Sequence, residues 1–261
     1  MNILDKIVID KRKEVELRKS LIPLRQLESS VLFERKTNSL AERLRTSASG
    51  IIAEHKRRSP SKSVINQSLN VQDVASGYEN AGVCGMSVLT DGKYFGGALD
   101  DIILARASCT MPLLRKEFII DPYQIIEAKA YGADVILLIA AILTKDEVKE
   151  FSELAKSLNL DVLLEVHNEE ELHKSIMPSL DMLGVNNRNL KTFEVNLDTS
   201  KLLSEQIPND FVKVSESGIS SIEAIKELQI FGYKGFLIGE NFMKTDNPGQ
   251  SAQEFIKALE S

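Results

Sequence analysis

The sequence predicts an α/β fold in which eight parallel strands, each followed by a helix, close into a (β/α)8 barrel. From about residue 50 onward, short β-branched runs alternate with longer amphipathic runs. Eight such units can be counted, and strands that are separated by helices lie parallel in one sheet. The length of 261 residues is used up by a single barrel of about 250 residues. We therefore expect one domain over 1–261, with an N-terminal helical extension at 1–48 and the barrel at 49–261.

The eight units follow one another without a long gap. Given as expected strand and then expected helix, they are Gly50–Glu54 and Val71–Ala81, Met86–Leu89 and Leu99–Ala107, Leu113–Lys116 and Pro122–Tyr131, Val135–Ile139 and Asp146–Leu158, Val162–Glu165 and Glu169–Ile176, Met182–Val185 and Leu197–Leu203, Val212–Val214 and Ser221–Leu228, and Phe236–Ile238 and Ala252–Leu259. An open, doubly wound sheet would show the same alternation, so the pattern alone leaves that alternative open.

Signals at the helix starts support this division. Thr144 with Glu147, and Ser220 with Glu223, have the spacing of capping boxes. Asp121 precedes a proline at the first helical position, which is a typical helix start.

The first 48 residues lie outside the eight units but are not featureless. Leu4, Ile7, Val8 and Val15 recur at helical spacing, and a second helical stretch is expected around Leu40–Leu44. We expect an extra helix that covers one mouth of the barrel. A disordered tail is the alternative, and the apolar spacing argues against it.

Composition excludes several classes of function. A net charge of −6 gives no basic field to hold a polynucleotide, so no nucleic-acid partner is expected. Cys84 and Cys109 make no disulfide framework, and the three histidines form no Cys/His cluster, so no metal site is indicated. The N-terminus has no uninterrupted apolar core, and the longest apolar run, Val135 to Leu143, is too short for a membrane span. We expect a cytoplasmic protein without a membrane partner.

Polar residues close the apolar strands, and in a barrel the active site forms at that end of the strands. The residues are Glu54 and Lys56 on strand 1, Lys116 on strand 3, Glu165 on strand 5, Asn186 on strand 6, Glu216, Ser217 and Gly218 on strand 7, and Gly239 on strand 8. Any one of them could be an ordinary salt bridge at the rim or a turn residue. Together they indicate a site, because a barrel directs all of its strand ends at one volume.

The last two strand ends indicate a phosphate site. Ser217 and Gly218 are followed by Ile219 and Ser220, and Gly239 opens another turn before a helix start. Loops after strands 7 and 8 commonly bind phosphate in such barrels through backbone N–H groups. Two ordinary glycine turns are the alternative. The basic run KRRSPSK after strand 1 is interpreted as an anion-holding loop rather than a nucleic-acid site, since it lacks interleaved aromatics.

At these residues the sequence resembles the indole-3-glycerol phosphate synthase family. The resemblance is carried by IIAEHKRRSPSK, VLTDGKYFGG, LLRKEFI, ADVILLIAAILT, LLEVH, LGVNNRNL, VSESGI and FLIGENFM, in family order, and by the opening ILDKIVIDKRKEVE, so that it spans nearly the whole chain. The chain departs from the family pattern at Ser63, where glycine is common, and at Glu240 and Asn241, where small polar residues are frequent.

The resemblance implies a carboxy-lyase of tryptophan biosynthesis. Its substrate is 1-(2-carboxyphenylamino)-1-deoxyribulose 5-phosphate. The aromatic carbon that bears the carboxylate attacks the ribulose ketone, CO₂ leaves, and water leaves to give indole-3-glycerol phosphate. Because ring closure itself creates the electron sink for CO₂ loss, no cofactor is expected. The partner is this small phosphorylated molecule, and the chain is expected to act as a monomer.

The resemblance also implies roles for individual residues. Lys116 is the expected general acid, and Lys56 holds the substrate carboxylate and protonates the departing hydroxyl. Glu165 is the expected partner in proton transfer, while Glu54 orients the lysines or serves as a second base. Asn186 completes the expected catalytic set, bonding substrate hydroxyls or phosphate as Ser217 does, and Phe95, Phe118 and Leu137 would wall the aromatic ring. The expected substrate-binding set is Ser59, Phe95, Phe118, Leu137, Arg188, Glu216, Ser217, Gly218, Leu237, Gly239 and Glu240.

Two other functions remain as alternatives. Another phosphate-binding barrel, such as a sugar-phosphate isomerase of the same pathway, needs one acid and one base but not two lysines at strand ends. A non-catalytic barrel that serves as a binding or scaffold module would be favoured by a missing lysine or glutamate, and none is missing.

Overall fold

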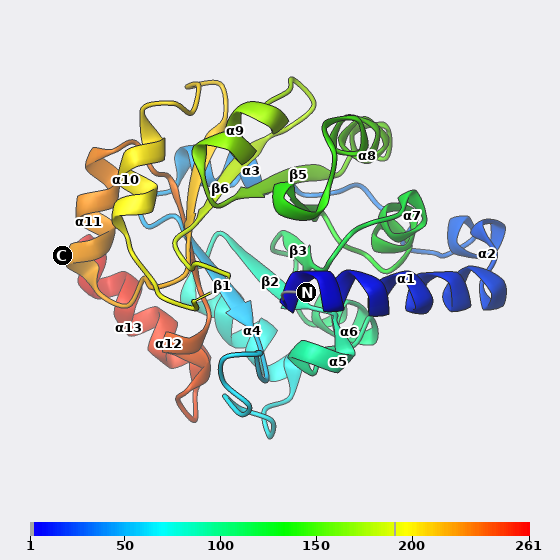
Figure 1. The fold of residues 1–261 in the computed structure, drawn as a ribbon. Coiled ribbons are helices and arrows are strands. Elements are labelled where there is room, and N and C mark those ends of the chain that lie inside the picture. The colour runs from blue at the N-terminus through cyan, green and yellow to red at the C-terminus, as the bar shows by residue number, and fades with distance from the viewer. Residues whose placement is uncertain (1–2, 191) are drawn as a thin grey trace.

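The computed structural model describes residues 3–190 and 192–261, and its eight strands form a closed barrel (Figure 1). Every strand pairs in parallel with the next strand of the chain, and β8 returns to β1 with Ile51 opposite Phe236. The prediction of a (β/α)8 barrel is therefore confirmed, and the open sheet is excluded. The strands are β1 Ile51–His55, β2 Gly85–Leu89, β3 Leu113–Lys116, β4 Val135–Ile139, β5 Asp161–Val166, β6 Met182–Asn186, β7 Val212–Glu216 and β8 Gly235–Ile238.

One helix follows each strand and packs on the outside of the barrel (Figure 1). These helices are α4 Val71–Ala81, α6 Asp100–Ser108, α7 Pro122–Ala130, α8 Lys145–Ser157, α9 Glu169–Ser175, α10 Asp198–Ser204, α11 Ile222–Ile230 and α13 Pro248–Glu260. Short helices α5 Gly92–Phe95 and α12 Glu240–Met243 and a 3₁₀ turn at Ala140–Ile142 lie in the connections. The sequence did not predict these three, because a single turn is too short to show helical periodicity.

Alternation along the strands separates an inner core from an outer one. On β4, Val135, Leu137 and Ile139 belong to the cluster inside the barrel, whereas Ile136 and Leu138 belong to the cluster between the barrel and its helices. The same period of two places Ile52 inside on β1. Every second residue of a strand faces the inside of the barrel. Polar residues at these inward-facing positions near the strand ends therefore point into the mouth of the barrel, where they can meet.

The N-terminal segment covers both ends of the barrel. Helix α1 (Ile3–Leu21) lies at the end where the strands finish, and it lines the cavity described below, so a helix over one mouth is present as expected (Figure 1). Helix α2 (Leu24–Glu28) leads to α3 (Leu40–Thr46), whose Leu40 and Leu44 approach the first residues of β2 and β8. The expected second helix therefore closes the opposite end, a position that the sequence did not predict.

The helix starts agree with two of the three expected caps. Thr144 forms a capping box with Glu147 at α8, and Asp121 accepts a hydrogen bond at the start of α7. The expectation for Ser220 is wrong, because Ser221 caps α11 and accepts from the backbone N–H of Ala224. A run of three adjacent residues, Gly218–Ser220, belongs instead to the turn that ends β7.

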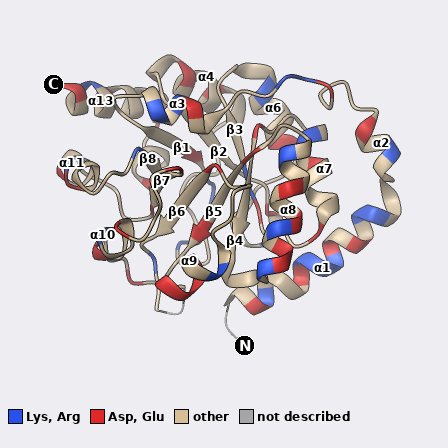
Figure 2. Cartoon of the chain, turned by 90° about the horizontal axis from the view of Figure 1, so that it is seen from above, with Lys and Arg blue, Asp and Glu red and all other residues tan. Residues whose placement is uncertain are grey.

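Charged residues of both signs alternate along the outer helices, as α1 and α8 show in Figure 2. These helices present mixed charge to solvent rather than a field of one sign. No helix in the described part of the chain is long and apolar enough to cross a membrane.

Candidate active site

A cavity of about 350 Å³ opens where the strands end, and all sixteen residues predicted for the site line it. Glu54, Lys116, Glu165, Asn186 and Glu216 come from strands β1, β3, β5, β6 and β7, and Leu137 and Leu237 come from β4 and β8. The other predicted residues come from the loops and short helices that follow the strands. The lining also contains residues that the sequence did not predict for the site, namely Ile3, Leu4 and Ile7 of α1, Leu89, Asp91, Glu117, Ile139, Leu190, Phe193, Ile238 of β8, Asn241 and Lys244, with loop residues Pro60, Ser61, Ile219 and Ser220.

Lys116 stands at the centre of the charged groups. Its Nζ donates to Glu165 Oε2 at 3.1 Å and also contacts Glu216 Oε2. Burial alone would lower the pKa of Lys116, but the carboxylates of Glu216, Glu165 and Glu54 outweigh it and raise the pKa above its ordinary value. The ammonium is therefore fully charged at neutral pH, and it joins carboxylates from two different strands.

Glu165 is held by three groups. Besides Lys116, Asn186 donates through Nδ2 to Glu165 Oε1 at 3.1 Å, and His167 Nε2 lies 3.3 Å from the same oxygen. Burial would raise the pKa of Glu165, but Lys116 and His167 lower it below its ordinary value. Asn186 thus has the position expected of a residue that orients the carboxylate, and Glu165 is ionised in the free site.

His167 is a residue that sequence reasoning missed. It lies between Glu165 and Glu171, whose Oε2 is 3.1 Å from His167 Nδ1. Burial would lower the pKa of His167, but the two carboxylates raise it to about 10. The signal is present in the sequence, because His167 follows Glu165 by two positions and so shares its inward row. From the sequence, His167 is considered only as a possible metal ligand, so this role is not predicted.

Glu54 and Lys56 meet as the period of two predicts. Lys56 Nζ donates to Glu54 Oε1 at 2.5 Å, and Ser87 on β2 reaches Glu54 Oε2 at 3.4 Å. A Cβ at Gly239 would lie 2.6 Å from Glu54 Oε1, so the absence of a side chain there makes room for this carboxylate. His55 packs outward and is buried, as expected from alternation.

Glu216 has an unusual environment. Burial and the nearby carboxylates of Glu165 and Glu54 raise its pKa to about 7, against the opposing effect of Lys116. Its Oε1 has no hydrogen-bond partner among the described residues. A Cβ at Gly184 would lie 2.4 Å from that oxygen, so this glycine of β6 admits the side chain. Glu216 itself lines the cavity, and a buried acceptor without a partner is suited to receive a hydroxyl group.

The apolar side of the cavity is formed by the three residues predicted for it. The rings of Phe95 and Phe118 lie 5.9 Å apart between centroids, and Leu137 is buried beside them on β4. Ile3, Leu4 and Ile7 of α1 complete this wall. The arrangement fits a flat aromatic group.

The turn after β7 has the backbone form that a phosphate loop requires. Ser217 and Gly218 have φ of 66° and 79°, which turns the chain sharply. Asn187, a buried residue that the sequence did not single out, donates to the carbonyl oxygens of Glu216 and Ser217 at 3.0 and 3.2 Å. Across from this turn, Gly239 leads into the short helix α12. Glu240 is paired with Lys62 at 2.6 Å.

The loop after β1 differs in part from its interpretation as an anion-holding loop. Lys56, Ser59 and Ser61 line the cavity. Arg57 instead pairs with Asp101, and Arg58 donates to the carbonyl oxygens of Gly92 and Lys93. These two arginines hold the loop against the segment after β2, and they do not line the cavity. Among the described residues, no group of three or more His, Cys, Asp or Glu side chains is arranged to hold a metal ion.

A closed (β/α)8 barrel whose strand ends carry two lysines and three carboxylates around an apolar wall defines an acid–base enzyme of the barrel class. The model of the indole-3-glycerol phosphate synthase family matches residues 4–255, and the chain belongs to this family.

Curated relatives agree with this membership. The indole-3-glycerol phosphate synthase of Bacteroides thetaiotaomicron is 48% identical over 259 residues, covering 99% of this chain and 99% of the relative. That of Acinetobacter baylyi is 43% identical over 255 residues, covering 97% of this chain and 95% of the relative. A solved structure, 3-hexulose-6-phosphate synthase from Salmonella typhimurium, has a TM-score of 0.64 at 12% identity, with 80% of this chain and 98% of that chain covered. It is similar in fold alone.

The expectation of a carboxy-lyase of tryptophan biosynthesis is therefore confirmed. The chain converts 1-(2-carboxyphenylamino)-1-deoxyribulose 5-phosphate into indole-3-glycerol phosphate. Neither the isomerase nor the scaffold alternative is needed.

Proposed function

We propose that this cavity performs the ring closure with Lys116 as the general acid and Glu165 as the group that accepts the released proton. The observation that supports this most strongly is the position of Lys116 Nζ, which is buried between carboxylates of β5 and β7 and faces the cavity. In that position an ammonium can reach a ketone oxygen without crossing bulk water. Lys56, Glu54 and Asn186 complete the proposed catalytic set.

Lys116 acts in the first step. The aromatic carbon attacks the ketone carbon, and the electron pair of the carbonyl bond moves to oxygen. The Lys116 ammonium donates its proton to this oxygen, which becomes a hydroxyl. Loss of CO₂ returns the electron pair of the broken carbon–carbon bond to the ring and restores its aromaticity. A preorganised charged donor in a water-poor site lowers the barrier to such charge development.

Proton donation by Lys116 prepares the next step. Once Lys116 is neutral, Glu165 and Glu216 lose the cation that favours their ionised form, so the pKa of each carboxyl rises. Glu165 thereby becomes a stronger base as the hydroxyl leaves and the last proton is released. Its low pKa in the free site is thus compatible with a later role as proton acceptor.

Lys56 is proposed to bind the substrate carboxylate and then to protonate the departing hydroxyl. Its ammonium lies at the entrance of the cavity, where the loop after β1 begins, while Glu54 holds it from one pleat deeper. Phe95, Phe118 and Leu137 would contact the aromatic ring between these charged groups.

The phosphate is proposed to bind where the turns after β7 and β8 meet. Ser217, Gly218, Gly239 and Glu240 line this corner, with Arg188 from the loop after β6. Backbone N–H groups at such turns suit a phosphate dianion. Ser59 and Leu237 complete the proposed substrate-binding set, together with Glu216, whose free oxygen would accept a ribulose hydroxyl.

The roles of the two glutamates are tested by replacing each with glutamine. Glu165→Gln should mainly lower kcat, because glutamine keeps the shape but accepts no proton. Glu54→Gln should lower activity and also shift the pH profile, because it removes the negative neighbour of Lys56. The measurement is kcat against pH for both variants and the wild type. If Glu165→Gln keeps most of its turnover and Glu54→Gln is inactive, the base works from β1 instead.

We also propose that the chain works as a monomer in the cytoplasm. The monomer is supported by the cavity, because a single chain supplies both lysines, all three carboxylates and the apolar wall. Light scattering of the purified protein at assay concentration tests the first statement, and fractionation of the producing cells tests the second.

A further inference from the structure

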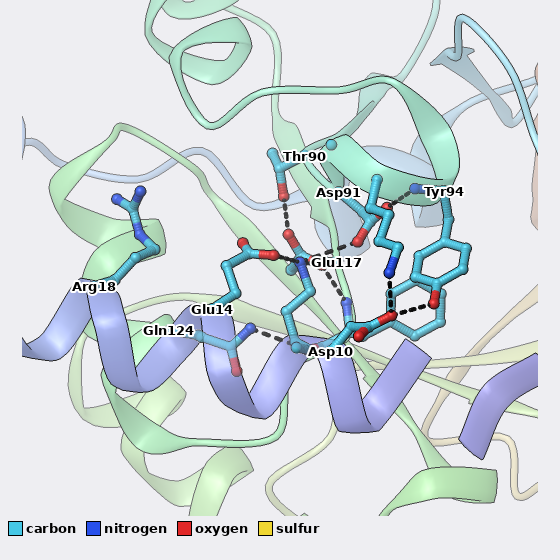
Figure 3. Close-up of polar contacts among 12 residues, drawn as sticks. Asp10, Glu14, Arg18, Thr90, Asp91, Tyr94, Glu117 and Gln124 are labelled. Atoms are coloured by element: carbon cyan, nitrogen blue, oxygen red, sulfur yellow. Dashed lines mark hydrogen bonds and ion pairs between the residues drawn. The ribbon is translucent and has the colours of Figure 1, made fainter. Parts of the chain in front are cut away.

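A buried ion cluster joins α1 to the ends of β2 and β3, next to the proposed general acid. Lys11 shares the inner face of α1 with Ile7 and Val15, and only 2% of its surface is exposed. Its Nζ lies 3.1 Å from Asp91 Oδ2, 3.1 Å from Glu117 Oε1 and 2.8 Å from Glu14 Oε2. Figure 3 shows the carboxylates of Glu14, Asp91 and Glu117 converging at this point.

Lys11 and Glu117 both carry their charge at physiological pH. Burial alone would lower the pKa of Lys11, but Glu117, Asp91 and Glu14 raise it above its ordinary value. Burial would raise the pKa of Glu117, but Lys11 and Arg115 lower it. A buried charge without a partner would be strongly unfavourable, so these groups depend on one another.

Two of the three carboxylates that bind Lys11 also hold parts of the proposed active site. Glu117 directly follows Lys116, and its Oε1 accepts from the backbone N–H of Phe118 at 2.8 Å. Its Oε2 accepts from the Thr90 hydroxyl at 2.7 Å (Figure 3). Glu117, which joins Lys116 to Phe118 of the aromatic wall, therefore fixes the backbone at Phe118 and ties the end of β3 to the segment after β2.

Asp91 holds the backbone at Phe95, which carries the other ring of that wall. Its Oδ1 accepts from the backbone N–H groups of Tyr94 and Phe95 at 2.7 and 3.2 Å, and so caps the short helix α5. A second link lies beside it, since Asp10 of α1 accepts from Lys93 Nζ at 2.7 Å and from the Tyr94 hydroxyl at 2.5 Å (Figure 3). The wall formed by Phe95 and Phe118 is thus tied to α1 through carboxylates.

We propose that Lys11 is a positioning residue for the ring closure. By binding Glu117 and Asp91 together, it sets the place of the Lys116 ammonium relative to the aromatic wall, and it holds Ile3, Leu4 and Ile7 at the cavity. Helix α1 is then part of the catalytic framework rather than a cover that adds only stability. This inference rests on the acid role proposed for Lys116.

The test compares Lys11→Met with Lys11→Arg. Lys11→Met should lower kcat about ten- to a hundredfold, because small displacements of a catalytic group cost that much. Lys11→Arg keeps the charge and should recover most of the loss. Wild-type values of kcat and KM in Lys11→Met would overturn the proposal.

A change of pH profile distinguishes positioning from a loss of packing. In Lys11→Met, Asp91 and Glu117 face each other without an ammonium, with Glu14 of α1 and Arg115 of β3 beside them. These carboxyls should then share a proton, and kcat should fall as rising pH removes it. The double variant Lys11→Met/Glu117→Gln should keep the lowered kcat but lose this pH step. A lowered kcat whose pH profile matches that of the wild type would contradict the proposal.

Lys129→Met is the matched control. Lys129 is also a buried lysine, 6% exposed, and its Nζ donates to the carbonyl oxygen of Arg35, so it ties the N-terminal segment to α7 away from the cavity. The Lys129→Met substitution should lower the melting temperature. Well below that temperature, it should leave kcat and KM unchanged. If Lys129→Met lost as much kcat as Lys11→Met, then any weakened attachment of the N-terminal segment would lower kcat, which would contradict the proposal. Lys116→Met is assayed in parallel, since near-normal turnover there would overturn the acid role and this proposal with it.

Discussion

His167 shows how one side chain sets the charge of a catalytic group. It lies against Glu165 on the side opposite Lys116, and Glu171 holds its other ring nitrogen. Its pKa of about 10 means that it carries a positive charge throughout the neutral range. Glu165 is therefore favoured as a carboxylate even after Lys116 has given up its proton, which keeps it available as a base.

The first prediction concerns His167→Gln. The kcat of the variant should fall about tenfold, because Glu165 loses a group that orients it. The pH dependence of stability should also change. Since the pKa of His167 rises from 6.5 in the unfolded chain to about 10 in the fold, its stabilisation is fully present below pH 6.5 and is lost as the pH rises toward 10. The difference in melting temperature between wild type and variant should therefore shrink from pH 6.5 to 10, and a constant difference would contradict the assignment.

The turn after β7 is the element on which phosphate binding is proposed to depend. Gly218 has φ of 79°, and a Cβ there would lie 2.3 Å from Val195 Cγ1. Any side chain here, alanine included, would therefore push Val195 aside as well as strain the backbone, and alanine disturbs the loop least.

Gly218→Ala should raise KM at least about tenfold, because backbone donors that bind phosphate move with the turn. It should also lose about 1–2 kcal/mol of stability from the left-handed φ. Gly82→Ala is the control, since Gly82 has φ of 81°, an added Cβ there would meet no atom within 4 Å, and the residue lies at the opposite end of the barrel. Gly82→Ala should lose about 1–2 kcal/mol from the left-handed φ, without the added contact that Gly218→Ala makes with Val195, and its KM should be unchanged. A normal KM in Gly218→Ala would place the phosphate elsewhere.

The elements that could be predicted are those whose pattern is local. Helix α4 and strands β3 and β4 have the bounds that the sequence indicates, because apolar spacing and caps define them residue by residue. Helices α5 and α12 escaped prediction because one turn has no period. The inward direction of Glu54 and Lys56 followed from alternation, whereas the contact of Lys116 with Glu216 did not, because it joins strands far apart in the chain.

Helix α1 contains a signal whose meaning only the fold supplies. Lys11 falls in the apolar row with Ile7 and Val15, which is an unusual place for a lysine. The sequence shows this anomaly but cannot name its partners, because Asp91 and Glu117 come from two other units of the barrel. Long-range ion pairs depend on how the strands are staggered around the barrel, and no local pattern records that.

At the scale of the whole molecule, the barrel gathers the charged groups of the proposed site at one end. The cavity holds Lys56 and Lys116 with Glu54, Glu165 and Glu216, although the chain as a whole has a net charge of −6 and mixed charge along its outer helices. Closure of the sheet brings five strand ends to one volume, and α3 seals the other end. The lysines and carboxylates of the proposed site are therefore brought together by closure of the sheet.

A prediction at this scale concerns chelation. In the proposed mechanism, the ammonium of Lys116 supplies the positive charge at the ketone oxygen, and ring closure supplies the electron sink for CO₂ loss. Turnover should therefore survive prolonged treatment with a chelator followed by assay in metal-free buffer. Loss of activity that returns on addition of Mg²⁺ or Zn²⁺ would mean that a metal ion performs the task assigned to Lys116.

The most direct test of the account is the rate of indole-3-glycerol phosphate formation by Lys116→Met. Because the variant lacks the charged donor at the ketone oxygen, kcat should fall about a thousandfold or more. Circular dichroism and the melting curve should show a folded barrel, so that the loss reflects chemistry. A folded Lys116→Met protein with near-normal turnover would remove Lys116 from the mechanism and contradict the account.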